Sequence, residues 1–345
     1  MSDASRARGV RLADVAERAG VSISTASNAL SGNRAVRAAY VERVLAAAAE
    51  LGYRRNEVAR SLRTGSRDTI GVVVPDVTNP FFADLIGRIE ALVTGRGWSM
   101  VLINTAFDTN REAAGLARLI SQTDGILLFS TRPDPLQVQP LVDLGMPVVA
   151  CDEIIGVPGV GGVYSDNEDG GRQVARHLVE AGGRRIGMIQ GPPTLPTAAA
   201  RRRGFEHGLA ECGVVLDPSD VVVQPYSLDG GRQGMRALLE AGRVDAVFAS
   251  TDMQAIGAMF ESLDRGVAVP ERMLVCGFDG ISWSERVAPA LSTVRQDSTA
   301  LAARSVEQLA AMIVDGVAAE RTVLPVELVP RASTARLGAV APPPS

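Results

Sequence analysis

Three segments near the start of the chain place apolar residues at the spacing of an amphipathic α-helix. The first covers residues 12–19, and its inward face is expected to consist of Leu12, Val15, Ala16 and Ala19. Gly20 follows and is well placed to end this helix. The third covers residues 38–51 before Gly52, with an expected inward face of Val41, Val44, Leu45 and Ala48. Helices this short are unstable singly, so the pattern predicts one small bundle.

The segment between these two helices, residues 20–32, reads GVSISTASNALSG and is unusually small and polar. Ser22 suits the N-cap of a second helix, and Ala26, Ala29 and Leu30 would face the bundle. The outward strip then consists of Ile23, Ser24, Ser27 and Asn28. Two helices joined by a tight turn form a helix-turn-helix, whose second helix presents such a strip to the major groove of DNA. A helical hairpin with a solvated polar face is the alternative.

Each outward side chain has a chemistry that suits contact with a duplex. Asparagine can bond an adenine edge, serine is less selective, and isoleucine can meet a thymine methyl group. Ser22 and Thr25 are candidates for phosphate contacts, which position a protein on DNA without reading bases. The strip is therefore compatible with a DNA-reading helix and, taken alone, equally with a solvated polar face.

The pattern of apolar and polar residues changes after residue 68. Residues 56–68 are polar and are interpreted as a linker, whereas the chain beyond alternates short apolar runs with helix-period segments. The expected strands are 70–74, 100–103, 125–129, 148–150, 185–189, 221–223, 246–249 and 274–276. The expected helices are 80–95, 110–121, 168–182, 199–211, 230–241, 252–264 and 298–314. This alternation predicts parallel sheets covered on both faces, either one large sheet or two smaller ones.

Composition and charge restrict the class of protein further. The 345 residues are 46% apolar and 21% charged, as in an ordinary soluble protein, and contain no apolar run long enough to span a membrane. The three cysteines are scattered and the N-terminal stretch lacks an apolar core of the signal-peptide type, so a reduced cytoplasm is expected. Residues 1–66 carry a net charge of +5 within a chain of net charge −4. A small basic head on an acidic body suggests that the head meets a polyanion.

The head and several later blocks together resemble one known family. The head is similar to the DNA-binding headpiece of LacI/GalR-type transcription regulators over the segment RLADVAERAGVSISTASNALSGNRAVRAAYVERVLAAAAELGYRRNEVARSLRTG. Five later stretches resemble blocks of the family's core: TIGVVVPDVTNPFF, DNEDGGRQVARHLVEAGGRRIGMIQG, RRRGFEHGL, FASTDMQAIGA, and VCGFDG with PALSTVRQD. The resemblance covers nearly the whole chain, with a highly specific match in the headpiece.

The resemblance implies a fold class and a division of the chain. The expected fold is a small all-α helix-turn-helix headpiece plus an α/β core of two doubly wound parallel-sheet subdomains, similar to periplasmic binding proteins. The expected divisions are a headpiece at 1–55, a hinge helix and linker at 56–68, an effector-binding and dimerisation core at 69–338, and a disordered tail at 339–345. The implied function is a homodimeric, cytoplasmic, sequence-specific transcriptional regulator, most simply a repressor. A small effector, such as a sugar or related polar metabolite, would set its affinity for a near-palindromic operator.

The resemblance also gives the linker a role. Residues 56–63 match the family's hinge helix, which pairs with its dimer mate in the minor groove. Leu62 matches the residue that wedges into the central base step and kinks the duplex. Tyr53, Asn56 and Arg60 are then expected to contact the backbone or the groove. Arg55 departs from the family's usual proline, so the start of the hinge is less rigid.

Effector candidates follow the ends of the predicted strands, where open parallel sheets bind ligands. From this rule and the resemblance together, the expected site consists of Phe81, Phe82, Asp152, Arg201, Tyr226, Thr251 and Asp279. Carboxylates and an arginine bond hydroxyl groups, and rings cover the apolar face of a sugar, so a polyol site is favoured. The two phenylalanines could instead be packing residues. Asp252 is interpreted as a helix N-cap and is left out of the site.

Two other classes of protein are compatible with parts of the sequence. A solute-binding protein would explain the core but neither the headpiece nor the lack of a signal-like segment. An α/β enzyme is disfavoured because only His177 and His207 occur and no phosphate-binding loop or nucleophile motif is present. No catalytic residue, metal site or cofactor is therefore expected.

Overall fold

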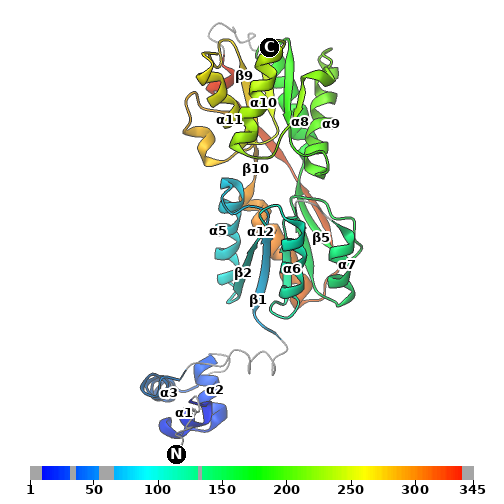
Figure 1. The fold of residues 1–345 in the computed structure, drawn as a ribbon. Helices are drawn as coiled ribbons and strands as arrows, with labels where there is room; N and C mark the ends of the chain where they lie inside the picture. Colours follow the sequence, from blue (N-terminus) through cyan, green and yellow to red (C-terminus); the bar gives the residue numbers. More distant parts are fainter. Residues whose placement is uncertain (1–9, 32–35, 54–65, 131–133, 336–345) are drawn as a thin grey trace, which may run out of the picture. The chain divides into compact units, whose positions relative to one another are not determined.

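The computed structural model describes residues 10–31, 36–53, 66–130 and 134–335. The chain divides into two compact units, Met1–Arg67 and Asp68–Ser345. Figure 1 shows the helices of the first unit in blue and the α/β arrangement of the second from cyan to red.

Three helices make up the described part of the first unit: α1 (Leu12–Ala19), α2 (Ile23–Ser31) and α3 (Ala38–Leu51). Their shared core consists of Val15, Ala16, Ala19, Ala26, Val44, Ala47 and Ala48. Gly20 and Gly52 end α1 and α3 in the left-handed conformation, with φ of 62° and 64°. The helix positions predicted from periodicity are confirmed.

The predicted inward face of α3 is wrong at one position. Leu45 is 53% exposed, whereas Val44, Ala47 and Ala48 are buried. A residue next to an inward one is rotated by about 100° around a helix of 3.6 residues per turn, which places Leu45 outside the bundle. The buried stripe runs through Val44, Ala47 and Ala48, and half-buried Leu51 packs against it.

The first sheet of the core unit has six strands in the order β11-β5-β4-β3-β1-β2, all paired in parallel. Its strands are β1 (Thr69–Val74), β2 (Ser99–Asn104), β3 (Gly125–Leu128), β4 (Val148–Cys151), β5 (Gly161–Ser165) and β11 (Arg321–Leu324). In register, Val72 of β1 lies opposite Leu102 of β2 and Leu127 of β3. The accompanying helices are α5 (Pro80–Thr94), α6 (Thr109–Leu119), α7 (Pro135–Asp143) and α12 (Ser298–Val314).

The second sheet also has six strands, in the order β12-β10-β9-β8-β6-β7. Its strands are β6 (Ile186–Gln190), β7 (Val221–Val223), β8 (Ala246–Ala249), β9 (Leu274–Asp279), β10 (Ser292–Gln296) and β12 (Val326–Val329). Its helices are α8 (Asn167–Glu180), α9 (Pro196–Glu211), α10 (Leu228–Ala241) and α11 (Asp252–Asp264), with short 3-10 turns η1 (Pro218–Asp220), η2 (Ser282–Glu285) and η3 (Ala332–Thr334). Only β12 is antiparallel to its neighbour, β10.

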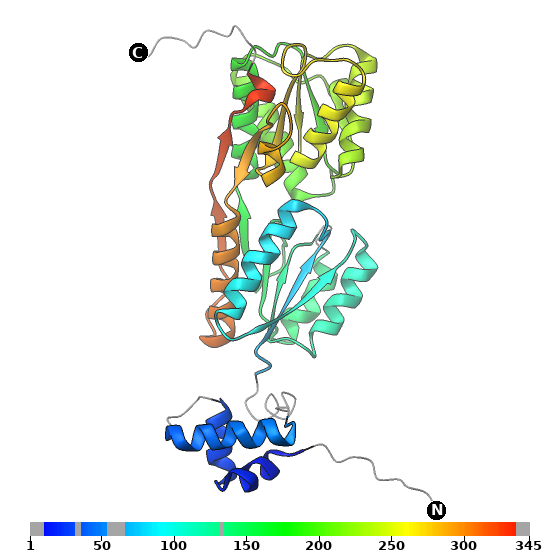
Figure 2. The ribbon, with the colours of Figure 1, turned by 90° about the vertical axis from the view of Figure 1, so that its left-hand side faces the viewer.

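The two sheets form the centres of two subdomains, which the chain joins by repeated crossings. It passes from β5 to α8, from β10 to α12, and from β11 to β12 (Figure 2). The predicted class, a helix-turn-helix head with two parallel-sheet subdomains, is confirmed. No helix in the described ranges combines the length and apolarity needed to cross a membrane.

Several elements were not predicted. Strands β5, β10, β11 and β12 and helix α7 lay outside the expected segments. Strand β5 begins with two glycines, and β10 reads STVRQ, so neither shows an uninterrupted apolar run. Strands β11 and β12 lie at sheet edges, have four residues each and read RTVL and VELV, which are too short to show a clear pattern. Pairing with neighbouring strands, rather than local pattern, forms these four strands.

Candidate functional site

The outward strip of α2 starts from a capped N-terminus. The Ser22 hydroxyl accepts a 3.1 Å hydrogen bond from the Thr25 backbone N–H and lies 2.9 Å from the Ser24 hydroxyl and 2.8 Å from that of Thr25. Ile23 is 56% exposed and Ser24 is exposed, whereas Ser27 and Asn28 are half-buried. The strip is therefore accessible chiefly at its N-terminal end, where a recognition helix makes most base contacts.

The remaining DNA-binding candidates fall at the end of the head. Tyr53 is half-buried and packs against the bundle core. Asn56, Arg60 and Leu62 lie outside the described residues. The head is braced nearby by Arg43, which donates to the Ala19 carbonyl at the end of α1, and by the 2.7 Å Arg18–Glu50 ion pair. These contacts hold α1 and α3 together, and α2 packs against both.

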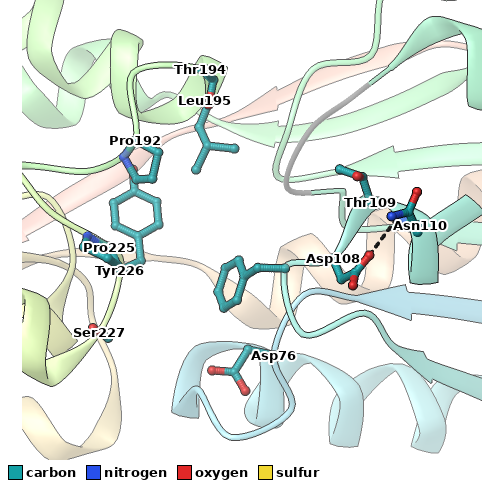
Figure 3. Close-up of a pocket in the computed structure, with 11 residues that line it drawn as sticks. Asp76, Asp108, Thr109, Asn110, Pro192, Thr194, Leu195, Pro225, Tyr226 and Ser227 are labelled. Atoms are coloured by element: carbon teal, nitrogen blue, oxygen red, sulfur yellow. Dashed lines mark hydrogen bonds between the residues drawn. The ribbon is translucent and has the colours of Figure 1, made fainter.

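A cleft of about 760 Å³ opens between the loops of the two subdomains (Figure 3). Its lining residues are Asp76, Phe107, Asp108, Thr109, Asn110, Pro192, Thr194, Leu195, Pro225, Tyr226 and Ser227. Figure 3 shows Tyr226 on one wall and Asp76, Asp108 and Thr109 on the other. Its volume lies within the range of small-molecule pockets. Of the seven effector-site residues predicted from the sequence, Tyr226 lines this cleft and the other six do not.

Arg201 is the centre of a buried polar cluster in the second subdomain. Its side chain is 3% exposed and donates to Asn167 Oδ1 at 2.7 Å, to the Ser250 carbonyl at 2.6 Å and to Asp279 Oδ1 at 3.3 Å. The guanidinium carbon lies 3.9 Å from the centre of the Phe278 ring. A cation fixed by three acceptors and a ring has one orientation, so it presents a rigid surface to any ligand.

The carboxyl groups around Arg201 hold their protons more tightly than usual. Burial raises the pKa of Asp279 to about 8, although the nearby Arg201 opposes this shift and Gln296 donates to the carboxylate at 3.0 Å. Burial also raises the pKa of Asp152, again against the effect of Arg201. Both residues have positive φ, 117° for Asp279 and 70° for Asp152. Such backbone strain in residues other than glycine is frequent at ligand sites.

Several polar atoms of this cluster have no hydrogen-bond partner among the described residues. They are Asp152 Oδ1, the Tyr226 hydroxyl, Ser250 Oγ and Gln296 Oε1. Burial raises the pKa of the Tyr226 phenol, so that group stays neutral. Unsatisfied buried polar atoms are costly. Hydroxyl groups suit such atoms, because a hydroxyl both donates and accepts.

Three other predicted site residues have packing or capping roles. Phe81 is 6% exposed and belongs to the hydrophobic core, whereas Phe82 is half-buried and packs edge-on against Phe129 at 6.1 Å between ring centres. Thr251 is 3% exposed and its hydroxyl accepts from the Gln254 N–H as the N-cap of α11. The structure thus brings Arg201 and Asp279 into contact, with Asp152 close enough to affect the arginine.

The interpretation of Asp252 as an N-cap is wrong, because Thr251 is the cap. Asp252 is fully buried, and its carboxylate accepts from the backbone N–H of Gly280 and of Ile281, both at 2.9 Å. It also accepts from the hydroxyls of Ser284 and Thr293. Asp252 therefore holds the loop that follows Asp279, which is a structural role next to the site.

The sequence interpretation missed several residues of the site. The cluster also contains Asn167, Thr197, Gln296 and Glu153, and the cleft wall contains Phe107 and Asp108. Glu153 directly follows Asp152 at the end of a predicted strand, so the post-strand rule already pointed to it. The others depend on contacts between distant segments and carry no comparable signal.

Comparisons with known proteins agree with this architecture. Residues 11–56 match bacterial regulatory proteins of the lacI family, and residues 175–334 match a periplasmic binding protein-like domain. The HTH-type transcriptional regulator CelR of Thermobifida fusca is 35% identical over 94% of this chain and 96% of its own length. The chain belongs to the LacI family of bacterial regulatory proteins. The catabolite control protein A of Priestia megaterium is 31% identical over 83% of this chain and 87% of its own length.

Solved structures of LacI-family members superpose on the chain. The lac repressor dimer bound to operator and the anti-inducer ONPF has a TM-score of 0.83 at 27% identity, covering 95% of this chain and 99% of its own. The complex of the regulator CelR with cellobiose has a TM-score of 0.71 at 31% identity, covering 94% and 99%. This LacI-family chain is thus a DNA-binding transcriptional regulator with a helix-turn-helix head and a periplasmic-binding-protein-like core.

Proposed function

We propose that this LacI-family regulator is a cytoplasmic homodimeric repressor whose operator affinity is set by a sugar or related polar metabolite bound between the two subdomains. The observation that carries the proposal is the buried Arg201–Asp279 cluster, together with its four unpartnered polar atoms. Similarity to the lac repressor dimer on operator supports the DNA-binding and dimeric parts. The role is regulatory binding, not catalysis.

The chemistry of the cluster favours a ligand with several hydroxyl groups. Arg201 donates, Asp152 accepts, and Asp279, Tyr226 and Ser250 can do either in their neutral forms. The rings of Tyr226 and Phe107 line the adjacent cleft and suit the apolar face of a sugar. The cellobiose bound to the similar regulator CelR supports a carbohydrate.

On the DNA side, we place α2 in a major-groove half-site, with base contacts from Ile23, Ser24, Ser27 and Asn28 and phosphate contacts from Ser22 and Thr25. The hinge at 56–68 would connect the head at 1–55 to the core at 69–338, with Leu62 as the wedge at the operator centre. A two-fold dimer then requires a near-palindromic operator. Effector binding and operator binding must influence one another by the same factor.

The DNA-binding proposal can be tested by selection from a library of random duplexes. The purified full chain should enrich a near-palindromic site, with a spacing of half-sites set by the dimer. A chain carrying Asn28→Ala and Ser24→Ala should lose preference at individual bases and keep most of its salt-dependent non-specific binding. Recovery of random sequence by the unmodified chain, with and without candidate ligands, would contradict the proposal.

The effector proposal can be tested by thermal shift against sugars, sugar phosphates, nucleosides and purines. A ligand at 100 times its Kd stabilises the core by about 2.7 kcal/mol. A hit should then change the affinity for the selected operator. If only purines or nucleosides raise the melting temperature of the protein, the effector is not a sugar, and the DNA-binding proposal is unaffected.

A further inference from the structure

Helix α9 (Pro196–Glu211) has an N-terminus that its own sequence cannot satisfy. The N-cap residue is Leu195, which makes no side-chain capping bond, and Pro196 occupies the first turn without a backbone N–H to offer. Thr197 therefore supplies the first N–H in the helix that needs an acceptor. Most other helices of the core have an Asp, Asn, Ser or Thr at this position, and its side chain accepts such a bond, as in Asp108 before α6 and Thr251 before α11.

Glu153, in the other subdomain, supplies the missing acceptor. It lies in the loop after β4, in the first sheet, whereas α9 packs in the second subdomain against α8. Glu153 Oε2 accepts from the Thr197 N–H at 3.1 Å, and Oε1 contacts the Thr197 hydroxyl. Both residues are buried, at 5% and 4% exposure.

The same helix turn leads into the candidate effector site. Arg201 lies four residues after Thr197, on the same face of α9. Thr197 also lies near Tyr226, close enough to affect the pKa of its phenol, although the two hydroxyls form no hydrogen bond of normal geometry. Tyr226 lines the cleft. Leu195, at the start of the helix, is on the cleft wall in Figure 3. Any motion of α9 relative to Glu153 therefore moves the ligand-facing side chains with it.

We propose that Glu153 is a latch that joins the two subdomains in the absence of effector by capping α9 across the cleft. The latch holds Thr197 and, through the same helix, Arg201 in place before any ligand arrives. It breaks when the subdomains separate, because the capping acceptor and the helix belong to different halves of the core. The inference concerns the ligand-free protein and does not depend on the identity of the effector.

The latch is expected to weaken as pH rises. Burial and the neighbouring Asp152 raise the pKa of Glu153 to about 8, against the effects of Thr197 and Arg201. Among the described residues, the titratable or charged groups that interact with it are Asp152, Arg201 and Tyr226. In the separated state the carboxyl meets water and ionises near its ordinary value. The joined state therefore binds one more proton than the separated state between the ordinary glutamate pKa of 4.5 and about 8, and rising pH across this window favours separation.

Amide hydrogen exchange of the ligand-free, full-length protein tests the latch directly. In a peptide spanning residues 192–200, Glu153→Ala should speed exchange of the Thr197 amide by about tenfold, the effect typical of a lost cap. Glu153→Gln keeps an acceptor for the amide and should preserve protection. Thr197→Ser keeps both donors and serves as the matched control.

The pH profile separates a latch from a merely structural residue. After correction for intrinsic exchange, protection of the Thr197 amide in the wild type should fall several-fold between pH 6.5 and 8.5. In Glu153→Gln, measured at the same pH values, it should not change with pH. Equal exchange in Glu153→Ala and wild type, or identical profiles in wild type and Glu153→Gln, would overturn the proposal. If Glu153→Ala does not fold, the comparison of wild type with Glu153→Gln still decides it.

Discussion

At the scale of single residues, the core contains two kinds of buried polar group. Asp252 uses its carboxylate fully, with four donors from the segment 280–293. Tyr226 leaves its hydroxyl without a partner among the described residues. The first kind stabilises the protein, and the second kind is available to a ligand. A substitution at Asp252 should therefore lower the stability of the core, whereas one at Tyr226 should weaken ligand binding.

Asp252→Asn should destabilise the core while leaving the helices of the head unaffected. The amide presents an N–H₂ group to donors that need an acceptor, so we expect the free energy of unfolding to fall by about 2–4 kcal/mol. Urea unfolding followed by tryptophan fluorescence measures this effect, because Trp98 and Trp283 both lie in the core unit. Asp229→Asn, on an exposed first turn of α10, is the control. An unchanged urea midpoint would contradict the structural role.

Tyr226→Phe should leave stability almost unchanged and weaken effector binding. The removed hydroxyl has no partner among the described residues, so the unfolding free energy should change by less than about 0.5 kcal/mol, whereas the Kd of a ligand found by thermal shift should rise roughly threefold to tenfold. Tyr40→Phe is the control, because Tyr40 loses the same hydroxyl and lies in the head unit, outside the core. Equal effects of both variants on binding would count against Tyr226 as a ligand contact.

At the scale of elements, helix α2 combines a packed inner face with a small polar outer face. Ala26 is fully buried in the bundle, and Ile23 is exposed on the other side. No arginine lies on the outer strip, so base contacts there are individually modest. Specificity must then depend strongly on the hinge segment and the deformation of the operator.

Leu62→Ala tests this dependence. If Leu62 wedges into the central base step, its loss should weaken operator binding far more than binding to random duplex, because only the kinked site benefits from the wedge. Gel-shift titrations at one salt concentration measure both affinities. Arg60→Ala is a useful comparison, since loss of a backbone contact should weaken both by similar factors. Equal losses for Leu62→Ala on the two DNAs would exclude the wedge.

At the scale of the whole molecule, the buried carboxyl groups link the core to pH. The pKa values of Asp279 and Glu153 are both raised to about 8, chiefly by burial. In the unfolded chain these groups ionise near pH 4, so the folded state binds more protons between these values. Their contribution to stability is therefore complete at acidic pH and is lost as pH rises through about 8.

The core should accordingly unfold at lower urea concentration at pH 8.5 than at pH 6. Each group contributes at most about 1.4 kcal/mol per pH unit over this window. Asp279→Asn retains an acceptor oxygen for Arg201 and Gln296 but cannot ionise, so the difference between the two pH values should shrink in this variant. A wild-type midpoint that is constant, or that increases with pH, would contradict the assignment of raised pKa values.

The sequence by itself determined the helices of the head, most strands of the two sheets and the family. These depend on local periodicity, on stop residues such as Gly20 and Gly52, and on motifs read within one segment. It also pointed to Arg201 and Asp279, which the structure brings together, although the helical pattern misplaced Leu45 and the cap of α11. Asn56, Arg60 and Leu62 stay predictions.

Only the tertiary structure decided which residues meet across the chain. Strand β10, with its polar STVRQ sequence, forms because β9 and β12 pair with it on both sides. Glu153 reaches Thr197 across 44 positions of sequence, and neither residue shows this contact in its local pattern. Periodicity shows which side of a segment faces the core, whereas a hydrogen bond between subdomains depends on how two distant segments are placed in the folded protein.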